Sequence, residues 1–240
     1  MKKYLSIGKT AEILGVTITT LRRWDKNGRL KSTKMPSGHR RYSVEQIDSV
    51  VQKSIFSTAL RWASSEQGSD PNESLYCPNS AVFQIRLMQM ERELSRIREL
   101  DSTFSLIVAA VGEIGNNSFD HNLGNWPDIS GIFFSYDIAR KHIALADRGQ
   151  GILNTLKKVR PKLKNHKDAL KMAFTEIISG RAPEERGNGL KFVREAVSSA
   201  GLDLYFQTGD VFLKLDKKNS RIDIKKAKIH ARGCFAFIKF

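Results

Sequence analysis

The 240-residue chain carries 40 lysines and arginines against 25 aspartates and glutamates, and this net charge of +15 favours phosphate-rich or otherwise acidic partners. Its 40% hydrophobic and 27% charged residues form a normal globular mixture and exclude a disordered chain. No apolar stretch is long enough to span a bilayer, no secretory signal follows the N-terminal lysines, and the two cysteines have no metal or redox spacing. We therefore expect a cytoplasmic protein that has no membrane partner.

Composition divides the chain into three regions. Residues 1–52 are basic and carry short helical patterns, and a polar stretch rich in Ser, Gly and Pro follows them. From about residue 79, helical and strand periods alternate. Because the length suits two compact modules, we predict a small domain over 1–52, a linker over 53–78 and a larger domain over 79–240.

The first region has the signals of two short helices and a wing. Ser6 can cap a first helix, and Gly15 supplies a sharp turn after it. Thr17 can cap a second helix that ends at Asn27-Gly28, with polar side chains free for the major groove of DNA. Residues 38–42, Gly-His-Arg-Arg-Tyr, are typical of a turn that enters a short basic strand. This order of elements predicts a winged helix-turn-helix.

Residues 6–42 resemble the MerR and excisionase type of DNA-binding domain. The likeness rests on Ala11, on the Gly15-Val16 turn, on residues 20–24 (Thr-Leu-Arg-Arg-Trp), on Gly28 and Leu30, and on the basic run 38–42. In that family the second helix enters the major groove and the wing clasps the phosphate backbone, which implies double-stranded DNA as the partner. By this resemblance the groove side holds Thr17, Thr19, Thr20, Arg22 and Arg23, and the wing holds Arg40, Arg41 and Tyr42. A basic mini-domain that only contacts proteins is the alternative.

The larger region mixes helices with strands. Helical spacing of apolar residues is found over 83–97, 103–119, 170–178 and 190–199. Strand patterns are found over 132–136, 143–146, 202–206, 211–215, 222–224 and 235–240. Helices grouped with a largely antiparallel sheet predict an α+β fold, here an α/β sandwich behind the small winged helix-turn-helix.

Short polar motifs in this region have the chemistry of a nucleotide site. Glu113 and Asn117 share a helix face, where a carboxylate can activate water and an amide oxygen can hold magnesium. Asp147 follows an apolar strand and can accept a hydrogen bond from an exocyclic amino group. Glycines follow Asp147, and others precede the helix that is predicted to begin at residue 190. Backbone N–H groups exposed at the start of a helix favour the binding of phosphate. Taken singly, these motifs are equally typical of a solvated helix face, a glycine-rich turn and a hinge.

In this order, the E-x-x-x-N, D-x-G-x-G and G-x-G-L motifs, with a final strand at 233–238, resemble the GHKL family of gyrase B subunits, MutL, heat-shock chaperones, histidine kinases and anti-sigma-factor kinases. The resemblance covers about 79–240 and implies the Bergerat fold with ATP and Mg²⁺. It makes Asn117 the magnesium ligand, Glu113 the base that activates water, and Asp147 the adenine acceptor. It also implies an adenine pocket shaped by Gly149 and Gly151, and phosphates held by Gly187, Gly189 and Leu190 under a lid over about 153–185.

The two resemblances together predict a DNA-binding regulator whose ATP-binding domain is a nucleotide-dependent switch and at most a slow ATPase. An anti-sigma-type serine/threonine kinase, or an ATP-dependent accessory factor of recombination or mobile-element defence, is the alternative. Cys234 stands where the GHKL family commonly has threonine, and no H-E-x-x-P motif precedes the ATP domain. A homodimer through helices 83–97 and 103–119, or a protein partner, stays open, because such apolar stripes more often form core.

Overall fold

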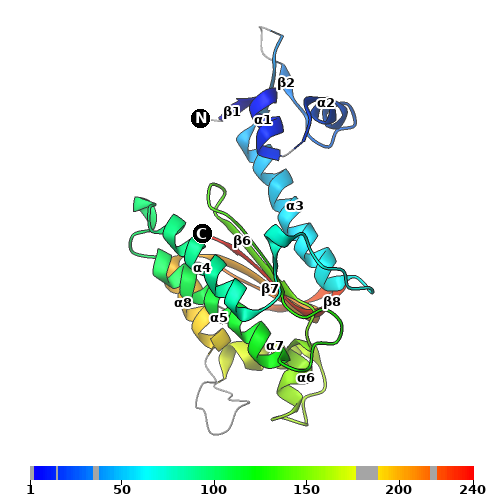
Figure 1. The fold of residues 1–240 in the computed structure, drawn as a ribbon, viewed down its shortest axis with the longest axis vertical. Coiled ribbons are helices and arrows are strands. Elements are labelled where there is room, and N and C mark those ends of the chain that lie inside the picture. Colours follow the sequence, from blue (N-terminus) through cyan, green and yellow to red (C-terminus); the bar gives the residue numbers. More distant parts are fainter. Residues whose placement is uncertain (1–2, 15, 35–37, 177–188, 217–220) are drawn as a thin grey trace. The chain divides into compact units, whose positions relative to one another are not determined.

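The polypeptide is divided into two units, Met1–Ser57 and Thr58–Phe240. The computed structural model describes residues 3–14, 16–34, 38–176, 189–216 and 221–240 (Figure 1). Helix α3 (Val44–Ser64) continues through the division, and Trp62 near its end is buried. Residues 58–78, which the sequence assigns to a linker, therefore count with the larger unit.

The smaller unit contains the predicted helices and wing. Its elements are β1 (Tyr4–Ser6), α1 (Ile7–Leu14), α2 (Ile18–Lys26), β2 (Thr33–Lys34), β3 (Arg40–Ser43) and the first part of α3. The strands pair in the antiparallel order β1-β3-β2, so the predicted wing strand lies between two partners. The Ser6 side chain accepts a hydrogen bond from the backbone N–H of Lys9, as expected of a helix cap. Gly15, the predicted turn, lies outside the described residues.

The larger unit is an α+β body. Its elements are η1 (Glu73–Leu75), β4 (Tyr76–Cys77), α4 (Ser80–Leu94), η2 (Arg98–Leu100), α5 (Phe104–Asn122), β5 (Ile132–Asp137), β6 (His142–Asp147), α6 (Gly151–Lys157), α7 (His166–Thr175), α8 (Gly189–Ala200), β7 (Asp203–Leu215) and β8 (Ile224–Lys239). The five strands form an antiparallel sheet in the order β4-β5-β6-β8-β7. This confirms the α+β class and the largely antiparallel sheet.

Two details of the predicted strands are wrong. The segments 202–206 and 211–215 fall along one strand, β7, which begins at Asp203. The segments 222–224 and 235–240 fall at the two ends of β8, which runs from Ile224 to Lys239. Register shifts at Gly209 let the two long strands stay paired across a local irregularity. The residues between the predicted segments 202–206 and 211–215 therefore form a bulge within one strand.

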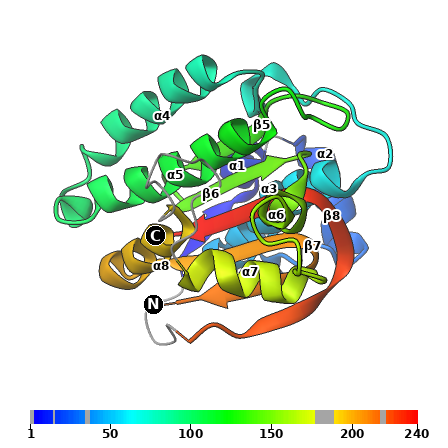
Figure 2. The ribbon, with the colours of Figure 1, turned by 90° about the horizontal axis from the view of Figure 1, so that it is seen from below.

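Helices cover one face of this sheet. Alternate strand residues such as Phe134, Leu145, Ile238 and Phe206 are buried in one core with residues of α4, α5, α7 and α8. Figure 2 shows α5, α7 and α8 over the same side of the sheet, with α4 running alongside α5. The carboxyl end of β6 lies at Asp147 and opposes Ile132 of β5. Helix α5 packs on both of these strands, which brings its polar residues close to the end of β6.

Candidate functional site

Helix α2 presents polar side chains to solvent and an apolar one to the core. Its N-terminus is capped by Thr17, whose side-chain oxygen accepts a 3.1 Å hydrogen bond from the Thr20 backbone N–H. Leu21 is fully buried, whereas Thr19 and Arg22 are exposed on the same helix. Thr17 and Arg23 are also exposed, and Thr20 is half-buried. The side chains predicted for the major groove therefore line the accessible side of an anchored helix.

Asp25 ties the end of α2 to the wing. Its carboxylate accepts hydrogen bonds from the Ser32 backbone N–H at 2.9 Å, from the Ser32 hydroxyl at 2.7 Å and from Arg40 Nε at 3.0 Å. Burial acts to raise the pKa of Asp25, but these hydrogen bonds and the Arg40 charge outweigh it and hold the pKa below its usual value. Arg40, which was predicted to lie in the wing, therefore also holds strand β3 to the end of α2 through Asp25.

Tyr42 does not face solvent. Its exposed fraction is 0%, and it packs in the core of the smaller unit with Leu21, Leu30 and Ile47. Strand β3 explains the difference, because successive side chains point to opposite faces and Tyr42 opposes Leu5 of β1. Arg41, its neighbour, stays half-exposed. The predicted DNA contact of Tyr42 is corrected to a supporting role inside the wing.

Glu113 and Asn117 meet the first residue of α8. Asn117 Nδ2 donates a 3.2 Å hydrogen bond to Glu113 Oε1, as their spacing on α5 predicted. Gly189 lies so close that a Cβ there would overlap the Glu113 carboxylate and lie 2.8 Å from Asn117 Nδ2. Leu190, the next residue of α8, is half-buried against the core. Gly187 lies outside the described residues.

Asp147 is buried at the end of β6, with an exposed fraction of 2%. Its Oδ1 accepts from the Gly149 backbone N–H at 2.8 Å, and its Oδ2 accepts from the Ser118 hydroxyl at 2.9 Å. Burial raises the pKa of Asp147 to about 6, although hydrogen bonds from Gly149, Ser118 and the Cys234 backbone act to lower it. A Cβ at Gly233 of the neighbouring strand would overlap Oδ1, so the carboxylate fits there because that residue is glycine.

The loop after Asp147 is packed between α5 and β7. A Cβ at Gly149 would overlap the Asn122 amide, and the Gln150 backbone N–H donates a 2.8 Å hydrogen bond to Asn122 Oδ1. Gly151 begins α6 with φ +69°, in the left-handed region that favours glycine. A Cβ on it would lie 3.1 Å from Thr208 Oγ1. The glycines that the sequence singled out are therefore places of close approach.

These contacts form a continuous polar cluster. It runs from Gly189 through Glu113 and Asn117 to Ser118 and Asp147, and on through Gly149 to Asn122. Sequence reasoning gave no role to Ser118, Asn122 or Thr208, and it placed Gly233 only at the start of the final strand. A usable signal existed for two of them, because Ser118 and Asn122 form a second pair four residues apart on the same helix, bonded through Asn122 Nδ2 and the Ser118 carbonyl at 2.7 Å.

Arg148, the residue after Asp147, points to a different part of the larger unit. It is fully buried and forms an ion pair with Asp128, with Nε 3.0 Å from Oδ2. It also donates to the Trp62 carbonyl and to the Ser65 hydroxyl and carbonyl, at the end of α3. Arg232 donates to the Ser65 and Glu66 carbonyls as well. Two arginines therefore hold the end of α3 to the strand ends next to the polar cluster.

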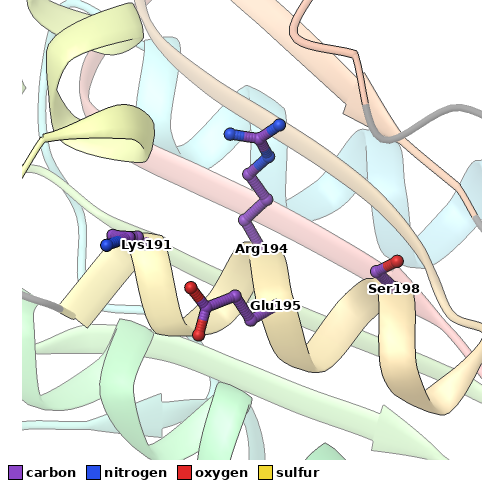
Figure 3. Close-up of a pocket in the computed structure, with 4 residues that line it drawn as sticks. All are labelled: Lys191, Arg194, Glu195 and Ser198. Carbon is purple, nitrogen blue, oxygen red and sulfur yellow. The ribbon is translucent and has the colours of Figure 1, made fainter.

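A small open pocket lies on α8, lined by Lys191, Arg194, Glu195 and Ser198 (Figure 3). It contains none of the predicted site residues. Within the parts of the chain that the structure describes, there is no cluster of three or more His, Cys, Asp or Glu side chains that could hold a metal ion.

Comparison with known protein families gives a match within the smaller unit. Residues 6–42 match the MerR family regulatory protein family, which spans the two helices and the wing described above. No curated protein matches the sequence. None of the described helices has the length and apolar character needed to cross a membrane. The chain therefore carries a MerR-family DNA-binding helix-turn-helix at residues 6–42, the DNA-reading part of a transcription regulator.

Proposed function

We propose that this protein is a DNA-bound regulator whose larger unit is a GHKL-type domain that binds ATP with magnesium and acts as a nucleotide-dependent switch. The observation that carries the proposal is the environment of Asp147. Its buried carboxylate receives hydrogen bonds only from neutral donors among the described residues, and it joins Glu113, Asn117 and Gly189 through Ser118. Perturbed carboxyl groups with neighbouring glycines are typical of ligand sites.

The Asp147 carboxylate has one acceptor position that the hydrogen bonds described above do not use. A carboxylate offers about four lone-pair positions, and three are used by Gly149, Ser118 and the Cys234 backbone. The exocyclic amino group of adenine can donate to the fourth, whereas guanine presents a carbonyl oxygen at the corresponding ring position. An acceptor fixed by the protein rejects the analogue that lacks the donor, so the site would select ATP over GTP.

Glu113 and Asn117 fit the phosphate end of such a ligand. The hydrogen bond to Glu113 uses the amide nitrogen of Asn117, and the amide oxygen is the atom that would ligate magnesium. Magnesium held there would neutralise negative charge on the phosphates. The Glu113 carboxylate would orient and deprotonate a water molecule. The first turn of α8, beginning at Gly189, would direct backbone N–H groups toward the phosphates.

Arg148 offers a physical link between nucleotide and DNA reading. It follows Asp147 in the chain, and its guanidinium holds the Trp62 and Ser65 backbone at the end of α3. The same helix begins at Val44, directly after the wing strand β3. A nucleotide that shifts Asp147 would therefore change the support of the helix that leads into the DNA-reading unit. This is the step by which ATP would alter DNA occupancy or oligomeric state.

Calorimetric titration with Mg-ATP tests the binding step. We expect wild type to bind, and we expect Asp147→Asn to weaken binding roughly 10- to 100-fold, because one hydrogen bond to a charged acceptor is lost. Asp203→Asn removes the same charge from an exposed position and should leave affinity unchanged. Mg-GTP should bind wild type more weakly than Mg-ATP. Absence of binding by wild type would refute the proposal.

Two further measurements separate switching from turnover. Affinity for a DNA duplex and oligomeric state are compared with and without Mg-ATP, and no change in either would refute the switch while leaving nucleotide binding intact. Phosphate release by wild type and Glu113→Gln tests hydrolysis, which should be slow and should fall in the variant. Transfer of labelled phosphate to a co-purified protein would instead support a kinase.

A further inference from the structure

The connection between α6 and α7 carries an unusual density of positive charge. Residues 157–171 contain seven lysines and arginines and a single acidic residue, Asp168. All seven basic side chains are exposed, while Leu163, Ala169 and Leu170 are buried beneath them. No ion pair engages these lysines and arginines within the described ranges. The segment is therefore a folded surface with its charges turned toward solvent.

A second basic segment lies on β8. Lys225, Lys226 and Lys228 are exposed, and of these Lys225 forms an ion pair with Asp223 at 3.2 Å. Strand pairing jumps from Val211 opposite Lys226 to Gly209 opposite Ala231, so residues 227–230 bulge from the ladder. The bulge is held by Gln207 Nε2, which donates a 2.6 Å hydrogen bond to the Ile229 carbonyl.

The fold brings these two segments together. The rings of His166, the first residue of α7, and His230, in the bulge of β8, meet edge to face with their centres 5.8 Å apart. Gly209 of β7 lies against the His166 ring, where a Cβ would overlap it. Helices α6 and α7 both contact β8, and Figure 2 shows them next to that strand. Segments separated by more than fifty residues therefore share one surface, which we call the basic ridge: the exposed lysines and arginines of 157–171 and 225–228.

The contact between the His166 and His230 rings is a packing contact. Burial lowers the pKa of His166, and the His230 and Lys157 charges lower it further, while Asp210 raises it. The lowered pKa favours the neutral form of the His166 ring. The acidic residues close to the ridge are few: Asp168 is hydrogen-bonded to Asn165, Asp223 is paired with Lys225, and Asp210 is half-buried.

We propose that the basic ridge binds the phosphate backbone of double-stranded DNA, as a second contact of the DNA that the helix-turn-helix reads. Phosphate contacts by lysine and arginine supply affinity that does not depend on base sequence. A second site tethered to a first one acts at high effective concentration, so weak phosphate contacts add substantially to binding. The inference rests on the MerR-family DNA-binding region and does not require nucleotide binding.

Duplex DNA fits the ridge better than a single strand does. Single-stranded nucleic acids are held by stacking of their bases on aromatic side chains. Among the described residues, no large apolar side chain and no Phe, Tyr or Trp is exposed in 157–171 or 225–228, and the exposed Ile229 follows the second segment. An array of point charges without stacking partners is suited to a regular line of phosphates.

The test is the salt dependence of binding to a long mixed-sequence DNA duplex by the full-length protein without nucleotide. The ridge variant is Lys158→Gln, Lys162→Gln and Lys164→Gln, and all three side chains are exposed between α6 and α7. The matched control is Arg92→Gln, Arg96→Gln and Arg98→Gln, which removes the same charge from a region that also contains Glu91, Glu93, Glu99 and Asp101. A third protein with arginine at 158, 162 and 164 keeps the charge.

We expect the ridge variant to lose about 10-fold or more in affinity near 100 mM salt, and the slope of log affinity against log salt to fall by about 2 to 3, close to one per phosphate contact. The control should change little, and the arginine variant should bind like wild type. Equal losses in ridge and control variants would show a general charge effect and overturn the proposal, as would no loss. Weakened Mg-ATP binding with unchanged DNA binding, or tighter binding to single strands, would overturn it too.

Discussion

Each unit of this protein contains one aspartate that gathers hydrogen bonds from neighbouring segments, and the two carboxylates are held in opposite ways. Asp25 of the smaller unit is paired with the Arg40 guanidinium and bonded twice by Ser32. Asp147 of the larger unit is more deeply buried, and its identified donors are two backbone N–H groups and one hydroxyl. The pKa of Asp25 is held below its usual value, and burial raises that of Asp147 to about 6.

Under the proposed function, this difference separates a structural use of a carboxyl group, at Asp25, from a ligand-binding use, at Asp147. A carboxylate that is paired with a cation stabilises the fold, whereas a buried one without a cation costs stability and is kept where a ligand needs it. The cation next to Asp147 in the chain, Arg148, is committed to Asp128 and the end of α3. We therefore expect substitutions at Asp25 and Arg148 to act on stability, and substitutions at Asp147 to act on nucleotide binding.

Replacing Arg148 with Met should have the largest effect on stability. The change leaves Asp128 without its partner and removes the donors to the Trp62 and Ser65 carbonyls, at a cost of about 3 kcal/mol in the free energy of unfolding. Urea unfolding followed by fluorescence of Trp62 and Trp126, which lie in the larger unit, measures it. Lys141→Met breaks the exposed pair with Glu99 and should cost less than about 1 kcal/mol. Equal costs would contradict the structural role of Arg148.

Asp147 should make the larger unit less stable as the pH rises. The folded state keeps its proton up to about pH 6, whereas the unfolded chain releases it near 3.8, so the folded state binds more protons between these values. The free energy of unfolding should fall by up to about 3 kcal/mol as the pH increases from about 4 to about 6. Asp147→Asn should lack this contribution, so its stability relative to wild type should grow over that range. If the difference in the free energy of unfolding between the two proteins stayed constant over this pH range, the prediction would be contradicted.

Asp25→Asn should show the reverse dependence in the smaller unit. At pH 7 we expect a loss of about 1 to 2 kcal/mol, because the Arg40 ion pair is removed and the bonds from Ser32 are weakened. The pKa of Asp25 is lowered in the folded state, so its contribution is present above the unfolded value of 3.8 and lost as the pH falls through the folded one. Wild type and variant should thus converge in acid. Fluorescence of Trp24 reports on this unit.

The spacing of residues close together in the sequence correctly predicted contacts within single helices and turns. The helix-turn-helix with its Thr17 cap and the Glu113–Asn117 pair on one helix face follow from residues within a turn of each other. The contacts that complete the polar cluster join residues far apart, such as Ser118 with Asp147, and no periodicity contains them. The buried face of Tyr42 could have been read from strand alternation, since Arg41 beside it faces outward. The bulge at Gly209 was not predicted, because the patterns over 202–206 and 211–215 indicated two separate strands.

Glycine-to-alanine substitutions give the smallest effects and the sharpest contrast between the units. Gly8 lies in α1 with nothing within 4 Å of its added Cβ, so Gly8→Ala should stabilise the smaller unit by about 0.5 to 1 kcal/mol through helix propensity alone. At Gly189 the added Cβ meets the flexible end of the Glu113 side chain, which can move away at little cost. Stability should change little in Gly189→Ala, but displaced Glu113 and Asn117 should weaken Mg-ATP binding. Calorimetry and urea unfolding of both variants distinguish these outcomes. If Gly189→Ala unfolded the larger unit while sparing the ligand affinity of the folded fraction, this glycine would serve the packing of α5 against α8 and not the nucleotide.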